Sequence, residues 1–446
     1  MTQAKKPAGV RNIEQGGIGT WLTVLVIGTL DTKSVELTAV AAEIEQLGAS
    51  VILLDTSGRA HPDLNGAQLS GGRVLISREE VAEAAGYSSA EIDGMDRGEA
   101  VVALRTGVAA TFSRLVNDGR IHAALCVGGA GAYVTRTAFE TSPIGFPKMV
   151  VSPLASGNRK FEPYVGTKDV ATLHSVADIV GLNSITSAVL RSAAGYVVGA
   201  AAATAHARRD DHQRPTIAVS LNGNTTDAVM RARDQIESDG YDLVAFHANG
   251  VGGRALENFV ASGQVTAVLD YTLTELAGTK IGGLMDAGPD RMESAGRLGL
   301  PQVLVPGCLD FITCGDLADT QRQYPGRTMF GHNPELTLVR LDAREMGILG
   351  QEFAKKANLA TGPTVVCIPE GGFSINDREG GRFWAPAANQ AFIKALKSEL
   401  RPDIKVVHSD RHINDDEFVS EVVAQLRHLL TAPRKSTATA AAAASL

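Results

Sequence analysis

Residues 23–57, TVLVIGTLDTKSVELTAVAAEIEQLGASVILLDTS, decide the fold class. An apolar run at 22–27 has no polar alternation and ends at Gly28, and a second run of the same kind occupies 51–54. Between them, residues 34–47 place apolar side chains at the spacing of one helix face. Uninterrupted apolar runs are typical of parallel strands that are covered on both faces. The segment therefore predicts a strand, a crossover helix and a second parallel strand.

The same arrangement recurs along the chain. Most of the 47 glycines fall where an apolar run ends and a helical pattern begins, as in strand–loop–helix units. This order predicts an α/β fold and excludes all-α and all-β folds. Seven further runs are expected to be strands: 123–127, 149–151, 216–220, 243–246, 267–269, 302–305 and 364–368.

Three segments of the first half have counterparts, in the same order, in the second half. One match between short apolar words would be chance, but three in matching order indicate a repeat. We therefore predict two tandem Rossmann-like domains with open parallel sheets, produced by duplication. The pairs are 23–57 with 216–249, 118–125 with 262–269, and 144–151 with 298–305.

Changes in composition divide the chain into five segments. The charged stretch TAHARRDDHQRP interrupts the apolar periodicity and ends in a proline, as expected of a linker. The last residues are rich in alanine and low in complexity, which predicts disorder. We expect a flexible N-terminus at 1–20, a first domain at 21–203, a linker at 204–215, a second domain at 216–430 and a disordered tail at 431–446.

The charge and the cysteines limit the class of protein. Lysine plus arginine number 42 against 49 aspartate plus glutamate, a net charge of −7, so we expect no nucleic-acid partner. The best apolar run, 193–205, is shorter than the roughly 20 residues that span a bilayer, and no secretory signal is visible, so we expect no membrane segment. Four cysteines without a CxxC pair predict a cytoplasmic protein with free thiols.

The loop GTLDTK at 28–33 is the first candidate ligand site. In open α/β sheets, ligands bind beyond the carboxyl ends of the strands. A loop that leads into a helix offers unpaired N–H groups, while two threonines and a lysine add hydroxyls and a cation for phosphate oxygens. The alternative is that Asp31 or Thr32 only caps the helix and Lys33 is solvated. The candidate phosphate-binding residues are Gly28, Thr29, Asp31, Thr32 and Lys33.

Three more loops follow strands that we expect to be neighbours. The turn GGAGA at 128–132 exposes backbone N–H groups, and an acidic residue after the second strand can reach a ribose hydroxyl. Glycine also serves plain packing of a helix on a strand, which is the alternative for the turn. The candidates in these loops are Gly128, Gly129, Gly131, Asp55, Ser57, Ser156 and Gly157.

The second domain offers acid, imidazole and amide groups at the equivalent places. Asp270 and Glu275 are candidates for a general acid/base pair, and His247 or His332 for assisting them or holding a metal. For each residue the alternative is a helix cap or a satisfied buried polar group. Cys308 is a further candidate, as a nucleophile. No metal-binding motif or GxSxG elbow is present, so the metal ligands stay unknown.

Many ordered motifs resemble one family: largely uncharacterised ATP-binding proteins of bacteria and fungi that are similar to the inhibitory, nucleotide-binding domain of the tomato mosaic virus resistance protein. The resemblance covers nearly the whole chain and is highly specific. The motifs include GTLDTK at 28–33, DRG at 96–98, PIGFPK at 143–148, ASG at 155–157, DIVGLN at 178–183, FHA at 246–248, GGRALE at 252–257, HNP at 332–334 and HIND at 412–415.

The resemblance implies two Rossmann-like domains, ATP in the first of them, accompanied by Mg²⁺, and a homodimer. It also implies a TIM-barrel protein as a further partner and a role in small-molecule catabolism. One departure concerns the second glycine turn, where the family pattern resembles GGSGG and this chain has Ala130 and Ala132. Losing a serine hydroxyl at 130 and gaining a methyl group at 132, close to a phosphate, would change the affinity for the nucleotide or even which nucleotide is bound.

Three hypotheses for the function follow. The first is an enzyme of small-molecule catabolism, with the substrate in the interdomain cleft. The second is a non-catalytic regulatory or scaffold protein in which ATP stabilises a dimer. The third is an ATP-independent lyase or hydrolase that acts on a phosphorylated metabolite.

Overall fold

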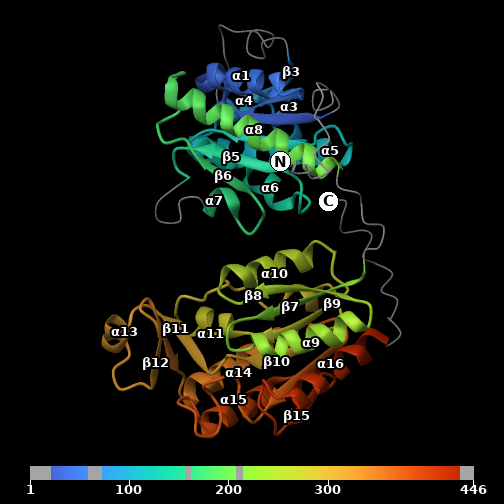
Figure 1. The fold of residues 1–446 in the computed structure, drawn as a ribbon, viewed down its shortest axis with the longest axis vertical. Helices are drawn as coiled ribbons and strands as arrows, with labels where there is room; N and C mark the ends of the chain where they lie inside the picture. Colours follow the sequence, from blue (N-terminus) through green and yellow to red (C-terminus); the bar gives the residue numbers. More distant parts are fainter. Residues whose placement is uncertain (1–21, 59–72, 156–161, 207–213, 432–446) are drawn as a thin grey trace, which may run out of the picture. The chain divides into compact units, whose positions relative to one another are not determined.

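A computed structural model describes residues 22–58, 73–155, 162–206 and 214–431 (Figure 1). The chain divides into two compact units, Met1–Asp210 and Asp211–Leu446, and each unit is described by itself. The expected N-terminal segment and alanine-rich tail lie outside the described residues, as does most of the expected linker. A substrate site between the units stays a prediction.

The first unit is built on a six-stranded sheet with the order β3-β2-β1-β4-β5-β6, in which all neighbouring strands are parallel. This is the Rossmann order, and it reverses between β1 and β4. The point between these two strands is therefore the expected ligand position. The strands are β1 Thr23–Gly28, β2 Ser50–Asp55, β3 Val74–Ile76, β4 Ala123–Val127, β5 Lys148–Ser152 and β6 Ala171–His174.

Helices cover both faces of this sheet. Val24 and Val26 of β1 pack in one core cluster with α1 and α8, whereas Leu25 and Ile27 pack in another with α5 and α6. A strand buried on both faces has no polar alternation, which explains the uninterrupted apolar run. The helices are α1 Leu30–Gln46, α3 Arg78–Ala84, α4 Ser89–Gly94, α5 Arg97–Asn117, the 3-10 helix η1 Ala130–Thr135, α6 Arg136–Thr141, α7 Glu162–Val165 and α8 Ser184–His206.

The second unit has its own six-stranded parallel sheet, with the order β15-β14-β10-β9-β7-β8. The predicted α/β class with two open parallel sheets is thereby confirmed. The strands are β7 Thr216–Leu221, β8 Asp242–His247, β9 Ala267–Thr272, β10 Gln302–Gly307, β14 Thr364–Pro369 and β15 Lys405–Ser409. The helices are α9 Thr226–Ser238, α10 Val251–Ala261, α11 Thr274–Lys280, α12 Ser294–Arg297, α13 Leu317–Gln323, α14 Ala343–Ala357, α15 Pro386–Glu399 and α16 Asp416–Thr431.

Four strands follow the same order in the two sheets. The repeated segments form β2-β1-β4-β5 in the first unit and β8-β7-β9-β10 in the second, each in that order across the sheet. The first sheet continues with β3 beyond β2, whereas the second continues with β14 and β15 beyond β10. The reversal point of the second sheet accordingly lies between β7 and β9.

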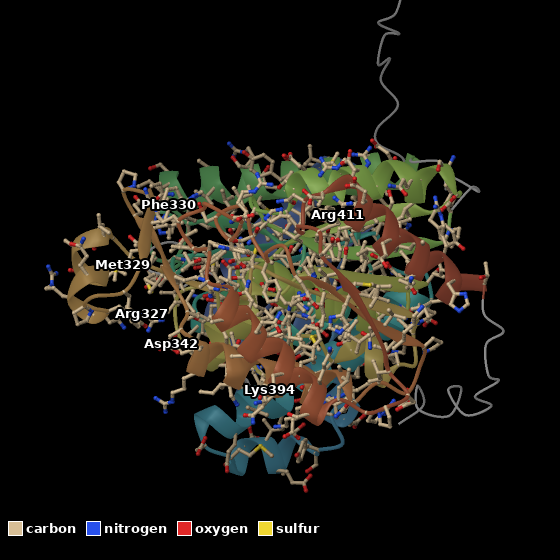
Figure 2. All side chains as sticks on the ribbon, turned by 90° about the horizontal axis from the view of Figure 1, so that it is seen from below. Arg327, Met329, Phe330, Asp342, Lys394 and Arg411 are labelled. Atoms are coloured by element: carbon tan, nitrogen blue, oxygen red, sulfur yellow. The ribbon has the colours of Figure 1, made fainter. Side chains whose placement is uncertain are left out.

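A three-stranded antiparallel sheet, absent from the sequence-based prediction, is inserted between β10 and β14. Arg327, Met329 and Phe330 mark this extension in Figure 2, where it lies at one end of the unit. Its outer strand β12 is half-buried to exposed, so it lacks the apolar run by which the other strands were identified. The strands are β11 Phe311–Cys314, β12 Met329–Asn333 and β13 Leu336–Arg340.

Helix α8 is longer and more apolar than the sequence run suggested. Its segment 184–205 is, among the described residues, the one helix whose length and composition would allow it to cross a membrane. Core helices of the same length meet that criterion, and Leu190, Ala194 and Val198 of α8 are buried in the first unit's core. The helix is therefore weak support for a membrane span.

Candidate functional site

The loops after β1 and β4 flank the reversal point of the first sheet, and they touch each other. A methyl group placed on Gly131 would lie 3.6 Å from the Cγ2 atom of Thr29, an ordinary van der Waals contact. The structure thus brings the predicted residues of GTLDTK together with those of the second glycine turn. Both loops belong to the edge where Rossmann sheets bind their ligands.

Three successive backbone N–H groups in the glycine turn have no partner among the described residues. The N–H of Ala132 donates to the Gly129 carbonyl at 3.0 Å and begins η1. Within the described part of the chain, no acceptor faces the N–H groups of Gly129, Ala130 and Gly131. Successive unpaired N–H groups in a turn form an anion-binding concavity. The alanine at 130 leaves this feature intact, because it changes a side chain and not the backbone donors.

The polar groups of GTLDTK lie beside this turn. The hydroxyls of Thr29 and Thr32 are 2.9 Å apart, and the Lys33 amine donates to the Ile179 carbonyl at 2.6 Å. Lys33 has φ −135° and ψ 24°, so a kink separates the first turn of α1 from the rest of the helix. An ammonium group has three donors. The single bond to Ile179 therefore leaves capacity for a phosphate oxygen.

Asp55 and Ser57 cap the N-terminus of α1 with side chains of the same unit. One carboxylate oxygen of Asp55 accepts the N–H of Leu30 at 3.1 Å and that of Ser57 at 2.9 Å, and the Ser57 hydroxyl also donates to it. The same hydroxyl accepts the N–H of Asp31 at 2.9 Å. Burial raises the pKa of Asp55. These contacts give both side chains a capping function, and contact with a sugar stays a prediction.

The other predicted residues of the first unit differ in what surrounds them. A methyl group on Gly28 would lie 2.8 Å from the Leu37 side chain and 3.0 Å from the Val127 carbonyl, so this glycine permits close packing of α1 on the sheet. One carboxylate oxygen of Asp31 is buried and has no hydrogen-bond partner. Ser156 and Gly157 lie outside the described residues.

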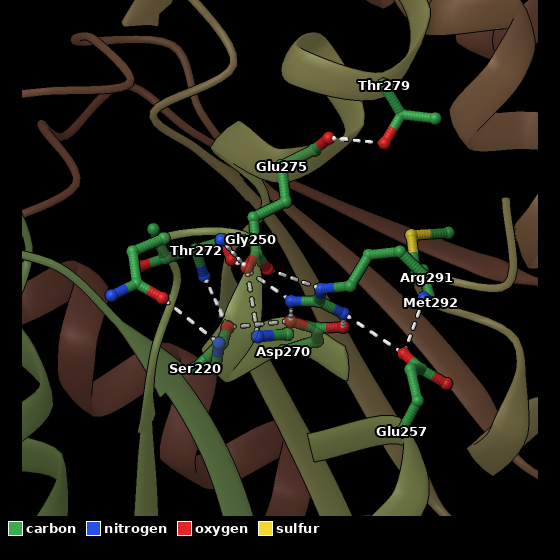
Figure 3. Close-up of polar contacts among 12 residues, drawn as sticks. Ser220, Gly250, Glu257, Asp270, Thr272, Glu275, Thr279, Arg291 and Met292 are labelled. Carbon is green, nitrogen blue, oxygen red and sulfur yellow. Dashed lines mark hydrogen bonds and ion pairs between the residues drawn. The ribbon is translucent and has the colours of Figure 1, made fainter. Parts of the chain in front are cut away.

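In the second unit, Asp270 and Glu275 converge on Arg291, which is fully buried (Figure 3). The two terminal nitrogens of Arg291 donate to the two oxygens of Asp270 at 2.5 and 2.7 Å. Its Nε donates to Glu275 at 2.7 Å, and a third carboxylate, Glu257, lies at 3.3 Å. One arginine thus neutralises part of a cluster of three buried acids.

The two predicted acids have further hydrogen-bond partners besides Arg291. Asp270 accepts the Ser220 hydroxyl at 2.6 Å, and the second oxygen of Glu275 accepts the N–H groups of Gly250 and Gly253 at 2.6 and 2.9 Å. Glu275 therefore occupies the N-terminus of α10 as an internal anion. With all four oxygens hydrogen-bonded inside the protein, the contacts describe a structural cluster. A proton-transfer function for the pair stays a prediction.

The two predicted histidines are separate from this cluster. His247 is exposed at the end of β8, and among the described residues no contact joins its imidazole to Asp270 or Glu275. His332 is exposed on β12 of the extension, 6.3 Å from Phe330 between ring centres. The adjacent groove has a volume of about 500 Å³, and its wall includes Arg382, stacked 5.1 Å above Phe330.

A second polar cluster, centred on Asp310, lies at the carboxyl ends of β7, β10 and β14. Cys308 follows β10 with φ +58°, and its thiol donates to the Asn222 amide oxygen at 3.4 Å. Burial raises the pKa of Cys308 well above its ordinary value, so the thiol is neutral and the nucleophile hypothesis gains no support. The carboxylate of Asp310 accepts the Ser374 hydroxyl at 2.8 Å.

Asp377 faces the same cluster from the loop after β14. Asp310 and Asp377 are fully buried, and each has one carboxylate oxygen without a hydrogen-bond partner. Arg340 is 3.8 Å from the free oxygen of Asp377, while His412 contacts the Ser374 carbonyl at 2.8 Å. Burial, and then the charge of Asp377, raise the pKa of Asp310 from 3.8 to about 7. A carboxyl group with a pKa near neutrality is suited to proton transfer.

Asp310 and Asp377 are not among the site residues predicted from the sequence, and His412 appears there only in the HIND motif at 412–415. Asp310 and Asp377 are more than sixty positions apart in the chain and meet only in the folded sheet. In the parts of the chain that the structure describes, no group of three or more histidine, cysteine, aspartate or glutamate side chains has the arrangement of a metal site. The metal ligands therefore stay unknown.

Comparisons with known proteins agree with the division into two units. The N-terminal domain model of the uncharacterised protein family UPF0261 matches residues 22–206, and the C-terminal domain model of that family matches residues 214–430.

Similar proteins carry the same family name in several bacteria. A UPF0261 protein of Clostridium tetani is 33% identical over 410 residues, covering 91% of this chain and 98% of that protein. A UPF0261 protein of Mesorhizobium japonicum is 36% identical, with 90% and 98% coverage. The ToMV resistance protein Tm-1(GCR237) of Solanum lycopersicum is 30% identical, covering 90% of this chain and 55% of that protein.

Solved structures also match over much of the chain. MurG of Acinetobacter baumannii covers 91% of this chain and 99% of its own, with a TM-score of 0.24 and 11% identity. A UDP-GlcNAc 2-epimerase of Neisseria meningitidis covers 63% and 82%, with a TM-score of 0.23 and 11% identity. Scores this low support no conclusion about ligands or activity.

Proposed function

The chain belongs to the uncharacterised protein family UPF0261, and from this premise we propose that its first unit binds ATP, or a closely similar nucleotide, at the reversal point of the sheet. The phosphates would lie between the GTLDTK loop and the glycine turn that follows β4. The observation that carries the proposal is the row of three N–H groups in that turn that meet no acceptor among the described residues, on a loop that lies beside Thr29 of GTLDTK.

The donors available at this place fit a polyphosphate. Backbone N–H groups of residues 129–131 approach without a large side chain, and Thr29 and Thr32 add hydroxyls on the facing loop. Lys33 would supply the cation, using an N–H that its bond to Ile179 leaves unused. Mg²⁺ in nucleotide sites takes much of its coordination from phosphate and water oxygens, so it is proposed together with the nucleotide.

The amides at the start of α1 belong to a different group. Those of Leu30 and Asp31 are already bound by Asp55 and Ser57, so they are not part of the proposed phosphate site. The proposed site therefore differs from nucleotide sites in which the backbone N–H groups at the start of the first helix bind the phosphates. The second glycine turn carries the larger share of the binding.

If the protein is an enzyme, we propose that the second unit supplies its proton-transferring group from Asp310 and not from Asp270 or Glu275. Asp310 retains an unpartnered oxygen, whereas every oxygen of the other two acids is bound. The three functional hypotheses then differ in their expected turnover. They are the catabolic enzyme, the ATP-stabilised scaffold and the ATP-independent lyase or hydrolase. Turnover would be lost in Asp310→Asn for either enzyme, and no turnover exists for the scaffold.

The proposal is tested by calorimetric titration of ATP with Mg²⁺ into the wild-type chain and two lysine variants. Lys33→Met removes the cation at the proposed phosphate site. Lys168→Met is the matched control, because Lys168 is also half-buried in the first unit and its amine also donates to a carbonyl, that of Ser142. The control lies close to Lys148, the first residue of β5, and thus near the opposite edge of the sheet.

We expect wild type and Lys168→Met to bind alike and Lys33→Met to bind at least tenfold more weakly, a difference of about 1.4 kcal/mol. At a hundredfold excess over Kd, ATP should also raise the stability of the wild-type chain by about 2.7 kcal/mol. Wild-type protein that binds no nucleotide would refute the proposal. Equal affinity in the two variants would remove Lys33 from the site.

A further inference from the structure

A groove in the antiparallel extension of the second unit has no part in the function proposed above. Its volume is about 500 Å³, and its lining comes from α13, β12, the turn that joins them and the loop after β14. Ligand pockets usually measure about 300–1,000 Å³, so the groove has room for a small organic molecule. The residues that line it indicate which class of molecule fits.

The two walls of the groove follow from the periodicities of α13 and β12. Leu317, Gln321 and Tyr324 are spaced by four and three positions, so they lie on one side of α13 and of the residue that ends it. Met329 and Gly331 are spaced by two positions, so they share one face of β12. The groove is therefore bounded by one helix face and one strand face. Figure 2 shows Met329 in this extension, at one end of the unit.

The apolar part of the lining is fixed by the core of the second unit. Tyr324 and Met329 are half-buried and pack against the cluster that contains Ile312 and Met346. Leu317, on the helix side, is 43% exposed and adds a further apolar side chain. A molecule in the groove would thus place an apolar part against side chains that are already held in position.

The charged part of the lining is positive. Among the described residues it includes two arginines and no aspartate or glutamate. The charge of Arg327 is balanced, because its guanidinium donates to Glu345 at 3.2 Å and lies 3.8 Å from Asp342. Arg382 is exposed, and in the part of the chain that the structure describes no carboxylate contacts its guanidinium. The groove therefore holds a positive charge that lacks a counter-ion.

Arg382 is held at the groove by its neighbours. Its guanidinium lies 5.1 Å from the ring centre of Phe330 and is stacked on that ring. The next residue, Phe383, is buried, lies 6.2 Å from Phe311 between ring centres, and donates its N–H to the Asn376 carbonyl at 2.9 Å. Stacking uses one face of a guanidinium, and the N–H groups in its plane remain available. Such a group binds a carboxylate or a phosphate through two parallel hydrogen bonds.

We propose that this groove binds a small anionic molecule, whose carboxylate or phosphate pairs with Arg382 and whose apolar part lies against Tyr324 and Met329. A cation would be repelled by Arg382, and a neutral molecule would leave its charge without a partner. The inference goes beyond the nucleotide site and does not rest on it, because the groove belongs to the second unit and shares no residue with the proposed phosphate site.

Saturation-transfer NMR on the full chain without nucleotide is the first test. The probes are benzoate and phenyl phosphate, which join the same apolar ring to either anionic group, and benzamide is their neutral counterpart. We expect at least one of the two anions to bind and benzamide to show no binding. Binding of only one anion would support the proposal and identify the preferred group. No binding of either anion, or equal binding of benzamide, would overturn it.

The second test compares two arginine variants with the anion that binds. Arg382→Met removes the charge and keeps a long side chain. Arg322→Met is the matched control, because Arg322 is also an exposed arginine of this extension but pairs with Asp319 and is not part of the lining. We expect Arg382→Met to bind at least about tenfold more weakly, because it loses hydrogen bonds to a charged group, and the control to bind like wild type. Equal affinity in the two variants would overturn the proposal.

A third test leaves Arg382 in place. A side-chain carbon added at Gly331 would meet nothing within 4 Å, so the strand has room for a larger residue there. Gly331→Glu would bring a carboxylate to the groove, where it competes with the anion for Arg382, whereas Gly331→Gln adds the same bulk without the charge. We expect the glutamate variant to bind at least about tenfold more weakly than the glutamine variant. Equal binding by the two variants would count against an anion site.

Discussion

Replacing Glu275 with glutamine tests whether the acid cluster of the second unit is structural. The substitution preserves the size of the side chain and removes its charge. In the wild-type chain the carboxylate accepts two backbone N–H groups at 2.6 and 2.9 Å and the Nε of Arg291 at 2.7 Å, and it is fully buried. The amide can continue to accept at one end, but its NH₂ group then faces the Arg291 donor.

The cost follows from these contacts. A hydrogen bond to a charged group contributes about 1.5–3 kcal/mol, and breaking a buried ion pair costs about 3–5 kcal/mol. Because Arg291 retains Asp270 and Glu257, we expect the lower end, about 3 kcal/mol. For a unit of about 200 residues, each kcal/mol lowers Tm by about 2–4 °C, so the expected drop is about 6–12 °C.

The assay is thermal unfolding followed by circular dichroism, with Glu335→Gln as the control. Glu335 is exposed in the same unit, and its replacement should change stability by less than about 0.5 kcal/mol. An acid kept for catalysis is often in surroundings that cost stability, so that its removal stabilises the protein. A Tm equal to or above that of wild type would therefore refute the structural interpretation of Glu275 and favour a catalytic one.

Three further predictions follow from single contacts. Gly253→Ala should destabilise the chain, because the new methyl group would lie 2.0 Å from the buried carboxylate of Glu275. Gly347→Ala, in an open helical position, should instead stabilise it by up to about 1 kcal/mol. A denaturant titration that ranks the two variants the other way would contradict this prediction. Because the pKa of Asp310 is raised from 3.8 to about 7 in the folded chain, the free energy of unfolding should fall as the pH rises from about 4 to 7. Urea unfolding at several pH values measures this dependence, and Asp310→Asn should flatten it between pH 4 and 7. The same pH dependence in wild type and Asp310→Asn would count against the prediction. Tyr164→Phe removes the hydroxyl that donates to the Gly129 carbonyl at 3.2 Å. The free energy of unfolding should fall by roughly 1 kcal/mol, and calorimetry should show that the free energy of nucleotide binding falls by more than this amount.

The sequence predicted the architecture well because the decisive strands are buried on both faces. A run such as 123–127 can be apolar throughout only where helices cover both sides of the sheet. Strands at an edge lack this signal: β6 is half-exposed, and β12 carries glycine, histidine and asparagine. The strands β6 and β12 form because they pair with neighbouring strands in the folded sheet. Their own residues show no pattern that predicts a strand.

The candidate sites were predicted less completely, for two physical reasons. A strand-end loop identifies donors and acceptors, but not which of them are already paired. The sequence predicts Asp55 as a sugar-binding residue and Glu275 as a general acid or base, and the structure adds that each accepts N–H groups at a helix N-terminus. Clusters that form across the sheet have no local pattern at all. Asp310 and Asp377 meet only because β10 and β14 are neighbours, a fact of topology that their separate loops do not record.

The carboxylate at the start of α10 has a consequence for ligand competition. A dissolved anion occupies a helix N-terminus only when its concentration is high enough. Glu275 belongs to the same chain, and Arg291 holds its carboxylate at the N-terminus of α10, so this position is occupied at any concentration of the protein. Even a flexible tether gives an effective concentration in the millimolar range, and a rigid one gives far more. The N-terminus of α10 therefore carries its own built-in anion, which fills the position that a phosphate takes at an open helix N-terminus.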